Sequence, residues 1–234
     1  MKSITKIGLA LLCTSILIFA VVIVFPYIVA LRHATVVASY QDTAGILQEQ
    51  EKQKMIQECR QFHIERRSDG DLQPLSSHQL KTYHTLLNMQ GNGIMACIEI
   101  PSIDVSLPIY HGDDDSTLRK GAGHCSWSDL PTGELGTHSV ITAHNGMAEA
   151  KMFSDLPGMK PGDIFSITVL DQKMDYRVIS TVTIKPDDMR LFTRQNDAAL
   201  CTLVTCVPFG INSHRFCVTG IRIKPSVCTS IENE

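Results

Sequence analysis

Residues 200–208 read Leu-Cys-Thr-Leu-Val-Thr-Cys-Val-Pro, an apolar run that ends at a proline. An uninterrupted apolar run of this length, rich in β-branched residues, is typical of a buried β-strand. Pro208 and Gly210 then force a loop, and Arg215 begins the next strand-like run. We therefore expect Cys206 at the end of a strand, with Arg215 brought beside it by a hairpin-like return.

A second strand-like run, Ser139 to Thr142, leads to His144, which precedes the tight-turn pair Asn145-Gly146. A cysteine is a good nucleophile only as a thiolate, and a histidine can help to form it and later protonate a leaving amine. An arginine can stabilise the negative charge that acyl transfer places on a carbonyl oxygen. Cys206, His144 and Arg215 thus have the chemistry of a thiol acyl-transfer site. Taken singly, a cysteine in an apolar run is more often a packing residue, a loop histidine is usually just solvated, and an arginine at a strand start is usually a surface charge.

The remainder of the chain from Gly93 onward has the pattern of a mainly β domain, a closed barrel or a sandwich. Turn signals such as Pro101, Pro131-Thr132-Gly133 and Lys160-Pro161-Gly162 separate the runs. One short helix is expected between strands, from Glu149 to Leu156. The expected strands are Ile94–Ile100, Ile103–Ile109, His138–Thr142, Ile164–Val169, Met174–Ile184, Leu200–Thr205 and Arg215–Ile223.

Helical patterns precede the barrel. Gln41 to Arg67 is polar, with apolar residues at irregular helical spacing, and predicts a juxtamembrane helix that ends at Ser68-Asp69-Gly70-Asp71. Ser76 and Gln79 have the spacing of a capping box and predict a short second helix.

The run from Ile7 to Leu31 is apolar apart from Thr14 and Ser15, and is long enough to span a bilayer. Lys2 and Lys6 precede it, which favours a cytoplasmic N-terminus and an extracellular catalytic domain. A cleaved signal peptide is the alternative, but its apolar core is usually about 7–15 residues long. We expect an uncleaved, single-pass anchor in the cell membrane.

Composition excludes other classes of function. The net charge is −3 and no basic stripe is present, so we expect no nucleic-acid partner. The eight cysteines contain no Cys-x-x-Cys pair, which argues against structural zinc, and we expect no metal and no cofactor. Cys97, Cys201 and Cys217 lie in strand-like runs, where cysteine commonly packs as a small apolar residue. Mostly free thiols are therefore expected, with a Cys201–Cys217 disulfide as the lesser alternative.

Several ordered motifs resemble those of the sortases, the surface transpeptidases of Gram-positive bacteria. Residues 202–206, Thr-Leu-Val-Thr-Cys, resemble the nucleophile signature, residues 212–215 the arginine segment, and residues 141–146 the histidine segment. Residues 93–101, 107–112 and 121–124 resemble the pilus-building class, class C. The resemblance covers about Gly91 to Ile223.

The resemblance implies an eight-stranded sortase β-barrel and a site made of Cys206, His144 and Arg215. The resemblance also implies a mechanism, in which Cys206 would attack the Thr–Gly carbonyl of a Leu-Pro-x-Thr-Gly-like sorting signal and form a thioacyl enzyme. The amine of a lysine on another pilin would then attack this intermediate and form an isopeptide bond. His144 would act as acid and base, and Arg215 would hold substrate and oxyanion. The implied partners are pilin subunits with sorting signals, and the membrane through the N-terminal helix. The oligomeric state stays open.

Other functions remain to be weighed against pilus assembly: attachment of surface proteins to peptidoglycan, hydrolysis by a cysteine protease, and a non-catalytic pilus scaffold. The expected organisation is a cytoplasmic N-terminus (1–6), a transmembrane anchor (7–31), a juxtamembrane helical segment with a vestigial lid region (32–90), the catalytic barrel (91–225) and a polar tail (226–234).

The chain departs from class C in two respects. It contains no Asp-Pro dipeptide, so the Asp-Pro-aromatic motif of the class C lid is missing, and it carries no second apolar segment after the barrel. We therefore expect a groove that is permanently open or differently gated, with the N-terminal run as the tether.

Overall fold

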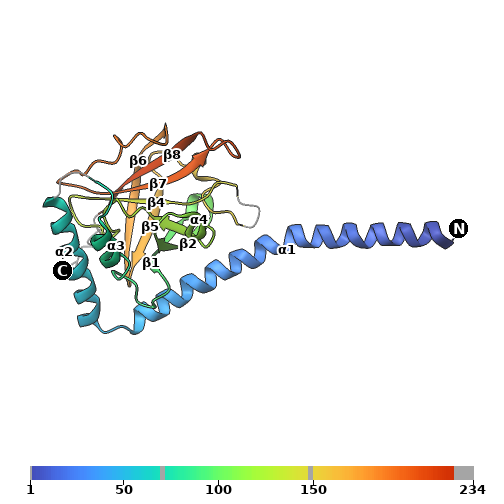
Figure 1. The fold of residues 1–234 in the computed structure, drawn as a ribbon, viewed down its shortest axis with the longest axis horizontal. Coiled ribbons are helices and arrows are strands. Elements are labelled where there is room, and N and C mark those ends of the chain that lie inside the picture. Colours follow the sequence, from blue (N-terminus) through green and yellow to red (C-terminus); the bar gives the residue numbers. More distant parts are fainter. Residues whose placement is uncertain (1, 69–71, 147–149, 224–234) are drawn as a thin grey trace, which may run out of the picture.

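The strand-like runs of the sequence close into a barrel. The computed structural model describes residues 2–68, 72–146 and 150–223, and its strands follow the order β1-β2-β3-β4-β7-β8-β6-β5 around the closed sheet (Figure 1). The helices, including the 3-10 turns η1 and η2, are α1 (Lys2–Ile46), α2 (Glu49–Ser68), α3 (Ser77–Tyr83), η1 (Pro101–Ile103), α4 (Asp115–Leu118) and η2 (Leu156–Gly158). The strands are β1 (Ile94–Ile100), β2 (Val105–His111), β3 (Ala122–His124), β4 (Thr137–Thr142), β5 (Ile164–Val169), β6 (Gln172–Ile184), β7 (Ala199–Val207) and β8 (His214–Arg222).

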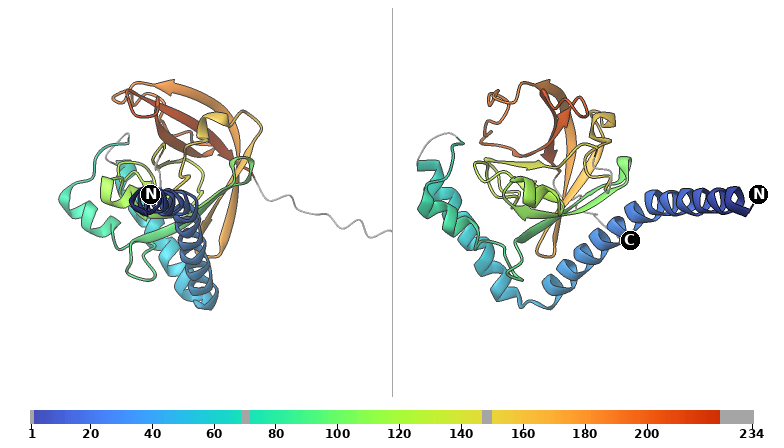
Figure 2. Two further views of the ribbon diagram at one scale, coloured as in Figure 1. Left: turned by 90° about the vertical axis from the view of Figure 1, so that its right-hand side faces the viewer. Right: turned by 45° about the vertical axis from the view of Figure 1, so that its right-hand side comes forward.

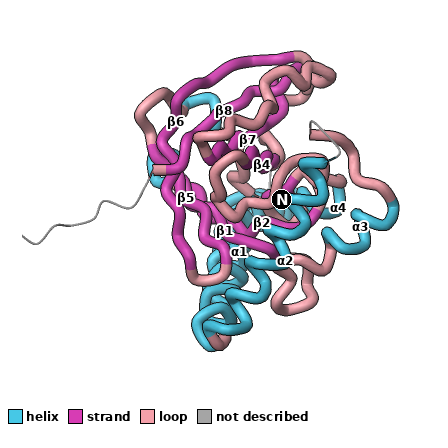
Figure 3. The backbone as a smooth tube through the Cα atoms, turned by 90° about the vertical axis from the view of Figure 1, so that its left-hand side faces the viewer, coloured by secondary structure: helices cyan, strands magenta, loops and turns pink. Residues whose placement is uncertain are grey.

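Strand pairing places three chain segments together at one end of the barrel. β4 runs parallel to β7, and β7 runs antiparallel to β8. Parallel neighbours end at the same edge of a sheet, so the segment after β4 emerges beside the end of β7. Figure 3 shows β4, β7 and β8 side by side among the strands.

Alternation of side chains builds the barrel core. On β6, Met174, Tyr176 and Val178 are buried while their neighbours on the opposite face are exposed, as a strand with one covered face requires. Phe165 of β5 stacks on Tyr176 at a ring-centroid distance of 5.3 Å. Such aromatic packing adds to the apolar burial that stabilises the domain.

Helix α1 has an exposed apolar half and a half that packs on the barrel. Among the described residues, it is the one helix long and apolar enough to cross a membrane. Near its C-terminal end, Val37 and Tyr40 are buried against the barrel. The Tyr40 hydroxyl donates to the Met95 carbonyl at 2.9 Å and accepts from the Leu170 amide at 2.8 Å. Figures 1 and 2 show the N-terminal half of α1 extending away from the barrel, beyond a bend, and Pro26 lies within the helix.

Helix α2 packs against the barrel through a buried arginine. The Arg66 guanidinium donates to the carbonyls of Ser128 and Trp127, both at 2.7 Å, and to that of Gln73 at 2.9 Å. This one side chain therefore joins α2, the segment before α3 and the loop before β4. The capping box at α3 is confirmed, because Ser76 and Gln79 bond reciprocally.

One strand was not predicted from the sequence, and another was predicted with the wrong bounds. β3 has only three residues. Apart from the glycine, the other two offer little strand signal. Gly123 is required there, since an added Cβ would lie 2.3 Å from the Gly112 carbonyl oxygen. The strand expected at Ile103–Ile109 instead runs from Val105 to His111. Pro101 to Ile103 forms a 3-10 turn, and Asp104 adopts φ 50°, which ends that turn before the strand begins.

The helix expected from Glu149 to Leu156 is wrong over the described residues. Met152 adopts φ 42°, a left-handed conformation that a helix does not accommodate. The segment forms turns, followed by η2. The juxtamembrane helix is also divided: α1 continues to Ile46, and α2 starts at Glu49. The expected stop at 69–71, the end of the barrel at 224–225 and the polar tail at 226–234 lie outside the described residues.

Candidate active site

Cys206 and Arg215 face each other across β7 and β8. Their Cα atoms are direct partners in the antiparallel register, one rung from the pair Thr205–Phe216. Side chains of directly opposed residues lie on the same face of a sheet. The hairpin-like return expected from the sequence is therefore confirmed, and it places the thiol and the guanidinium group on one surface.

The segment that carries His144 is bonded to the end of β7 along its length. The Ala143 amide donates to the Val204 carbonyl at 3.2 Å, and the Thr205 hydroxyl donates to the Ala143 carbonyl at 2.9 Å. Beyond the histidine, Asn145 Nδ2 donates to the Cys206 carbonyl at 2.8 Å. His144 is thus held between two residues that bond the cysteine strand, which brings it to the same end of the barrel as Cys206.

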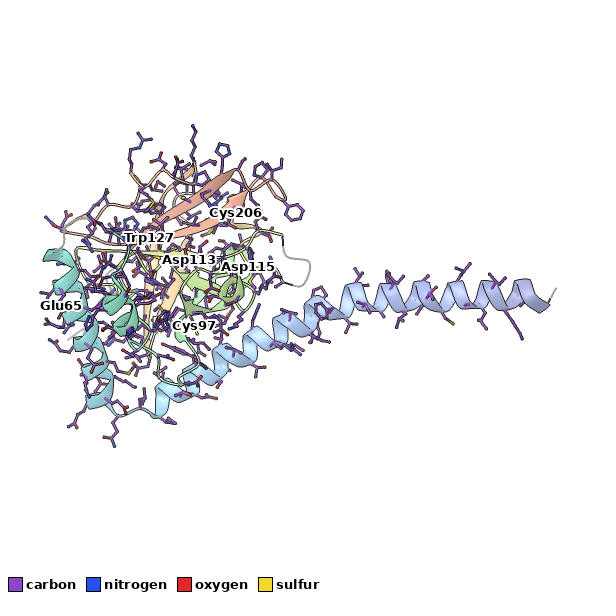
Figure 4. The ribbon with its side chains drawn as sticks, in the orientation of Figure 1. Glu65, Cys97, Asp113, Asp115, Trp127 and Cys206 are labelled. Atoms are coloured by element: carbon purple, nitrogen blue, oxygen red, sulfur yellow. The ribbon has the colours of Figure 1, made fainter. Side chains whose placement is uncertain are left out.

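The His144 ring contacts a carboxylate from α4. His144 Nε2 lies 3.6 Å from Asp115 Oδ1, and the histidine side chain is 29% exposed. The other Asp115 oxygen, Oδ2, pairs with Arg119 at 2.9 Å. Figure 4 shows Cys206 and Asp115 on the side of the barrel toward which the N-terminal half of α1 extends. A carboxylate at this distance restricts the orientation of the imidazole ring.

Helix α4 is held in place by its cap. Asp114 accepts hydrogen bonds from Ser116 and from the amide and hydroxyl of Thr117. The hydrogen bond from the Ser116 side chain, followed by those from Thr117, lowers the pKa of Asp114 to about 2. Asp114 is therefore ionised at neutral pH, and it fixes the turn that presents Asp115.

The Arg215 side chain is oriented by its own turn. Nη1 donates to the carbonyls of Asn212 at 3.0 Å and His214 at 3.1 Å. These bonds hold the guanidinium group at the mouth of the β7–β8 turn. Among the described residues, no hydrogen bond joins the Cys206 thiol to the His144 ring; catalytic contacts are often loose before substrate binds.

An apolar cluster of buried and partly buried side chains adjoins Cys206, and we call it the groove floor. Val204 and Cys217 lie two residues from Cys206 and Arg215 on the same faces of their strands. They pack in one cluster with Cys125, Val140 and Phe192, and with the partly buried Trp127, Ile184 and Leu191. Leu72, which precedes α3, packs against this cluster as well. The floor is therefore partly covered by a leucine from the region in which the Asp-Pro-aromatic motif is missing.

Burial distinguishes Cys206 from the cysteines around it. The Cys206 side chain is partly exposed, whereas Cys201 and Cys217 are fully buried. Burial raises the pKa of Cys217 to about 12, although Arg215 acts in the opposite direction. All seven cysteines of the described residues are free thiols. Cys201 opposes Gly220 and Cys217 opposes Val204, so the alternative Cys201–Cys217 disulfide lacks the required pairing.

The structure brings the three residues singled out in the sequence to one end of the barrel, and it adds residues beside them that the sequence analysis did not single out. Asp115, Asn145, Thr205 and Leu72 contact the site in the structure. Asp115 stood within three consecutive aspartates, a pattern equally typical of a solvated turn, and only the β3–β4 pairing brings α4 near His144. In the described part of the chain, no group of three or more metal-ligating side chains is present.

Comparison with known proteins identifies the family. The model of the sortase domain matches residues 98–223, more than half of the chain. The chain therefore belongs to the sortase family, whose members are cysteine transpeptidases. The eight-stranded closed barrel with its short helices matches the sortase fold.

Class C sortases are among the similar solved structures. Sortase C1 from Streptococcus agalactiae is 33% identical, with a TM-score of 0.78 over 81% of this chain and 98% of that one. Sortase C from Streptococcus pneumoniae is 34% identical, with a TM-score of 0.71 over 81% and 97%. Sortase D from Bacillus subtilis is 29% identical over 139 residues, which cover 57% of this chain. This match spans 65% of the Bacillus protein, slightly less than two thirds of its length.

Proposed function

We propose that this chain is a membrane-anchored cysteine transpeptidase that polymerises pilin subunits. It would cleave a Leu-Pro-x-Thr-Gly-like sorting signal between Thr and Gly and join the threonine acyl group to a lysine amine of another pilin. The observation that carries the proposal is the β7–β8 register, which aligns Cys206 with Arg215, together with the hydrogen bonds that hold the His144 segment against β7.

The chemistry follows from these positions. His144 takes the proton of the Cys206 thiol as Sγ attacks the threonine carbonyl, and Arg215 stabilises the resulting oxyanion. The C–N bond breaks, His144 donates a proton to the departing glycine amine, and a thioester remains on Cys206. A lysine amine then attacks the thioester, its proton passes by way of His144 to the departing Cys206 sulfur, the C–S bond breaks, and an isopeptide bond forms. The free thiol is regenerated.

Substrate recognition is assigned to the groove floor. The apolar cluster beside Cys206 suits the leucine and proline of a sorting signal, since apolar pockets bind apolar side chains by removing them from water. Pilin as the acceptor is supported by similarity to class C enzymes, including the Streptococcus pneumoniae sortase C whose structure bears on pilin substrate specificity. Membrane anchoring is supported by the apolar half of α1.

The test is mass spectrometry of the full chain in detergent, incubated with a pilin that ends in a Leu-Pro-x-Thr-Gly-type signal. The full chain is needed because Tyr40, a buried residue of α1, bonds the barrel. We expect a thioacyl adduct on Cys206 and ladders of linked pilin, both absent from a Cys206→Ala variant.

Other products would redirect the assignment. Transfer of the cleaved signal to a peptidoglycan-type amine, without ladders, would favour wall anchoring. Release of a free carboxylate even with amine present would favour hydrolysis. Ladders formed by Cys206→Ala would mean that the chain acts as a scaffold and not as the enzyme.

A further inference from the structure

The turn between β7 and β8 carries two strongly exposed apolar side chains. Phe209 is 67% exposed and Ile211 is 72% exposed. They lie two residues apart in residues 208–213, a segment without an acidic residue. Single exposed apolar residues are ordinary, but a paired tip of this kind, next to the cysteine strand, indicates a contact with an apolar medium or partner.

Contacts along the chain place this turn near the end of the apolar half of α1. Phe25 and Val29 line a cavity together with Ala150, and Pro26 and Ala30 line another with Met152. Ala150 and Met152 belong to the segment that carries His144. The last turns of the apolar run therefore lie at the level of the site, and not at the opposite end of the barrel.

The same segment supports the tip. Gly146, two residues after His144, is packed so closely by Phe209 that an added Cβ would lie 2.0 Å from the phenylalanine ring. Figures 1 and 4 show the β7–β8 turn on the side of the barrel toward which α1 extends, with Cys206 just behind it. Helix α1 cannot swing freely on the barrel, because the Tyr40 hydroxyl bonds Met95 and Leu170 and its side chain is 1% exposed.

Basic side chains lie at the same level. Arg32 follows the apolar run directly, and it lines one cavity with Arg119 and Lys120 of the barrel. Cations near a bilayer surface are attracted by anionic headgroups, and aromatic or apolar side chains enter the interfacial layer below them. The apolar span, the basic residues and the exposed tip thus have the order that an interfacial contact requires.

We propose that the β7–β8 turn inserts Phe209 and Ile211 into the interfacial layer of the membrane in which α1 is anchored. The inference rests on the membrane anchor of the proposed function. The barrel then rests on the bilayer with the mouth of the site at its surface, where a substrate tethered to the same membrane presents its sorting signal. The anchor and the tip are two contacts with one surface, and together they fix the orientation of the enzyme.

Fluorescence quenching by brominated lipids tests the insertion. The full chain is reconstituted into phosphatidylcholine–phosphatidylglycerol vesicles whose phosphatidylcholine carries bromine on its acyl chains. Ile211→Trp adds one tryptophan at the tip, and the parent, with Trp127 as its single tryptophan, gives the baseline. The matched control is Leu135→Trp, because Leu135 is 60% exposed and lies beside the opposite end of β7, where the Gly136 amide bonds Ala198.

We expect the emission added by Ile211→Trp to fall by about half in brominated vesicles, and that added by Leu135→Trp to stay unchanged, since interfacial side chains reach the upper acyl chains. Phe209→Trp is a second, conservative reporter and should behave like Ile211→Trp. Absence of quenching at both tip positions overturns the inference, and so does equal quenching at Leu135→Trp. Emission that changes only when a soluble sorting-signal peptide is added also overturns it, because the tip would then contact substrate.

Flotation of the vesicles tests the membrane anchor separately from the insertion of the tip. If the chain floats with the vesicles and the tip is not quenched, the insertion fails while the anchor stands. If the chain does not float, both the anchor and the insertion fail. Catalysis is measured separately with a soluble peptide, so neither result depends on turnover.

Discussion

At the scale of single residues, the site depends on side chains that hold the three central groups. Asn145 and Thr205 fix the ends of the His144 segment on β7, and Asp115 faces the imidazole. None of these would perform chemistry on a substrate. Their contribution is geometric, because a catalytic group displaced by about 1 Å can lose a large part of its effect.

We predict that Asp115→Asn lowers kcat/KM by up to about fivefold, since exposed ion pairs contribute about 0.2–1 kcal/mol. The substitution keeps the shape of the side chain and removes the charge that faces His144. Salt screens an exposed charge, so the difference between the two proteins should shrink as ionic strength rises. Steady-state transpeptidation at low and high salt is the measurement.

The control is Asp155→Asn, which removes a comparably exposed carboxylate that pairs with Lys151 instead of His144. It should leave the salt dependence of kcat/KM as in the parent. An Asp115→Asn protein with unchanged kcat/KM at low salt would exclude a role for Asp115 in positioning His144.

His124 makes stability depend on pH. Burial lowers its pKa to about 3, while its ring contacts the Tyr83 hydroxyl and the Asp129 carbonyl. The unfolded chain binds a proton near the ordinary value of about 6.5, so the stability is fully present above that pH and is lost as pH falls toward 3. Burial also lowers the pKa of His111 and His138, which act in the same direction.

We predict that the free energy of unfolding decreases as pH falls from 6.5 to 5, and that His124 contributes about 1.4 kcal/mol per pH unit to this decrease once its unfolded form is fully protonated. His124→Gln should make this slope shallower, as measured by urea unfolding at several pH values. The exposed His78→Gln serves as the control and should retain the parental slope. Equal slopes for His124→Gln and the parent would contradict the burial argument.

At the scale of elements, the strands were predictable where they were long and the short pieces were not. β1 was predicted with its observed bounds, because a run of seven residues, all apolar except Glu99, lies between turn signals. β3 is three residues long and exists through its pairing with β2 and β4, which no local pattern encodes. Likewise, Cys206 and Arg215 could be placed from one hairpin, but Asp115 reaches His144 only through tertiary packing.

We expect the segment before α3 to limit access to the groove floor. Leu72 packs on the apolar cluster beside Cys206, although the sequence lacks the Asp-Pro-aromatic motif and predicts an open or differently gated groove. A leucine held there by apolar contact alone would be displaced more readily than a side chain that is also held by charge. Covering by Leu72 fits a groove that is differently gated.

We predict that Leu72→Ala increases the rate at which a bulky maleimide labels Cys206, because the shorter side chain uncovers the floor next to the thiol. Labelling of the full chain is followed by intact-mass spectrometry. Leu80→Ala, a substitution on the surface of α3, should leave the rate unchanged. If Leu72→Ala labels no faster than the parent, the groove is open without any cover.

At the scale of the whole molecule, burial divides the described cysteines from Cys59 onward into one accessible thiol, Cys206, and a buried set. Cys59, Cys97, Cys125, Cys201 and Cys217 are buried in the described structure, while Cys206 is partly exposed. Burial raises the pKa of Cys59 and of Cys97 to about 12 in each case. Only a very small thiolate fraction is then present at neutral pH, and the thiolate is the reactive form.

We predict that iodoacetamide modifies Cys206 in the native protein and leaves the five buried cysteines unmodified until the chain is unfolded. Peptide mapping before and after urea treatment gives the comparison. Cys13 and Cys228 are replaced by serine in the test protein, so that reactivity outside the barrel does not contribute. Modification of a buried cysteine as fast as Cys206 in the native state would contradict the packing described for the barrel.

The parallel pairing of β4 with β7 has a consequence for the order of folding. The hydrogen bond between Thr205 and Ala143 joins residues 62 apart in the chain, and no local contact can replace it. Closing a loop of that length costs conformational entropy before the contact can contribute any stability, so such pairings form late. During synthesis the cysteine strand also follows the histidine strand. A nascent chain therefore carries separated, chemically ordinary residues, and the capacity for acyl transfer arises only when the barrel closes.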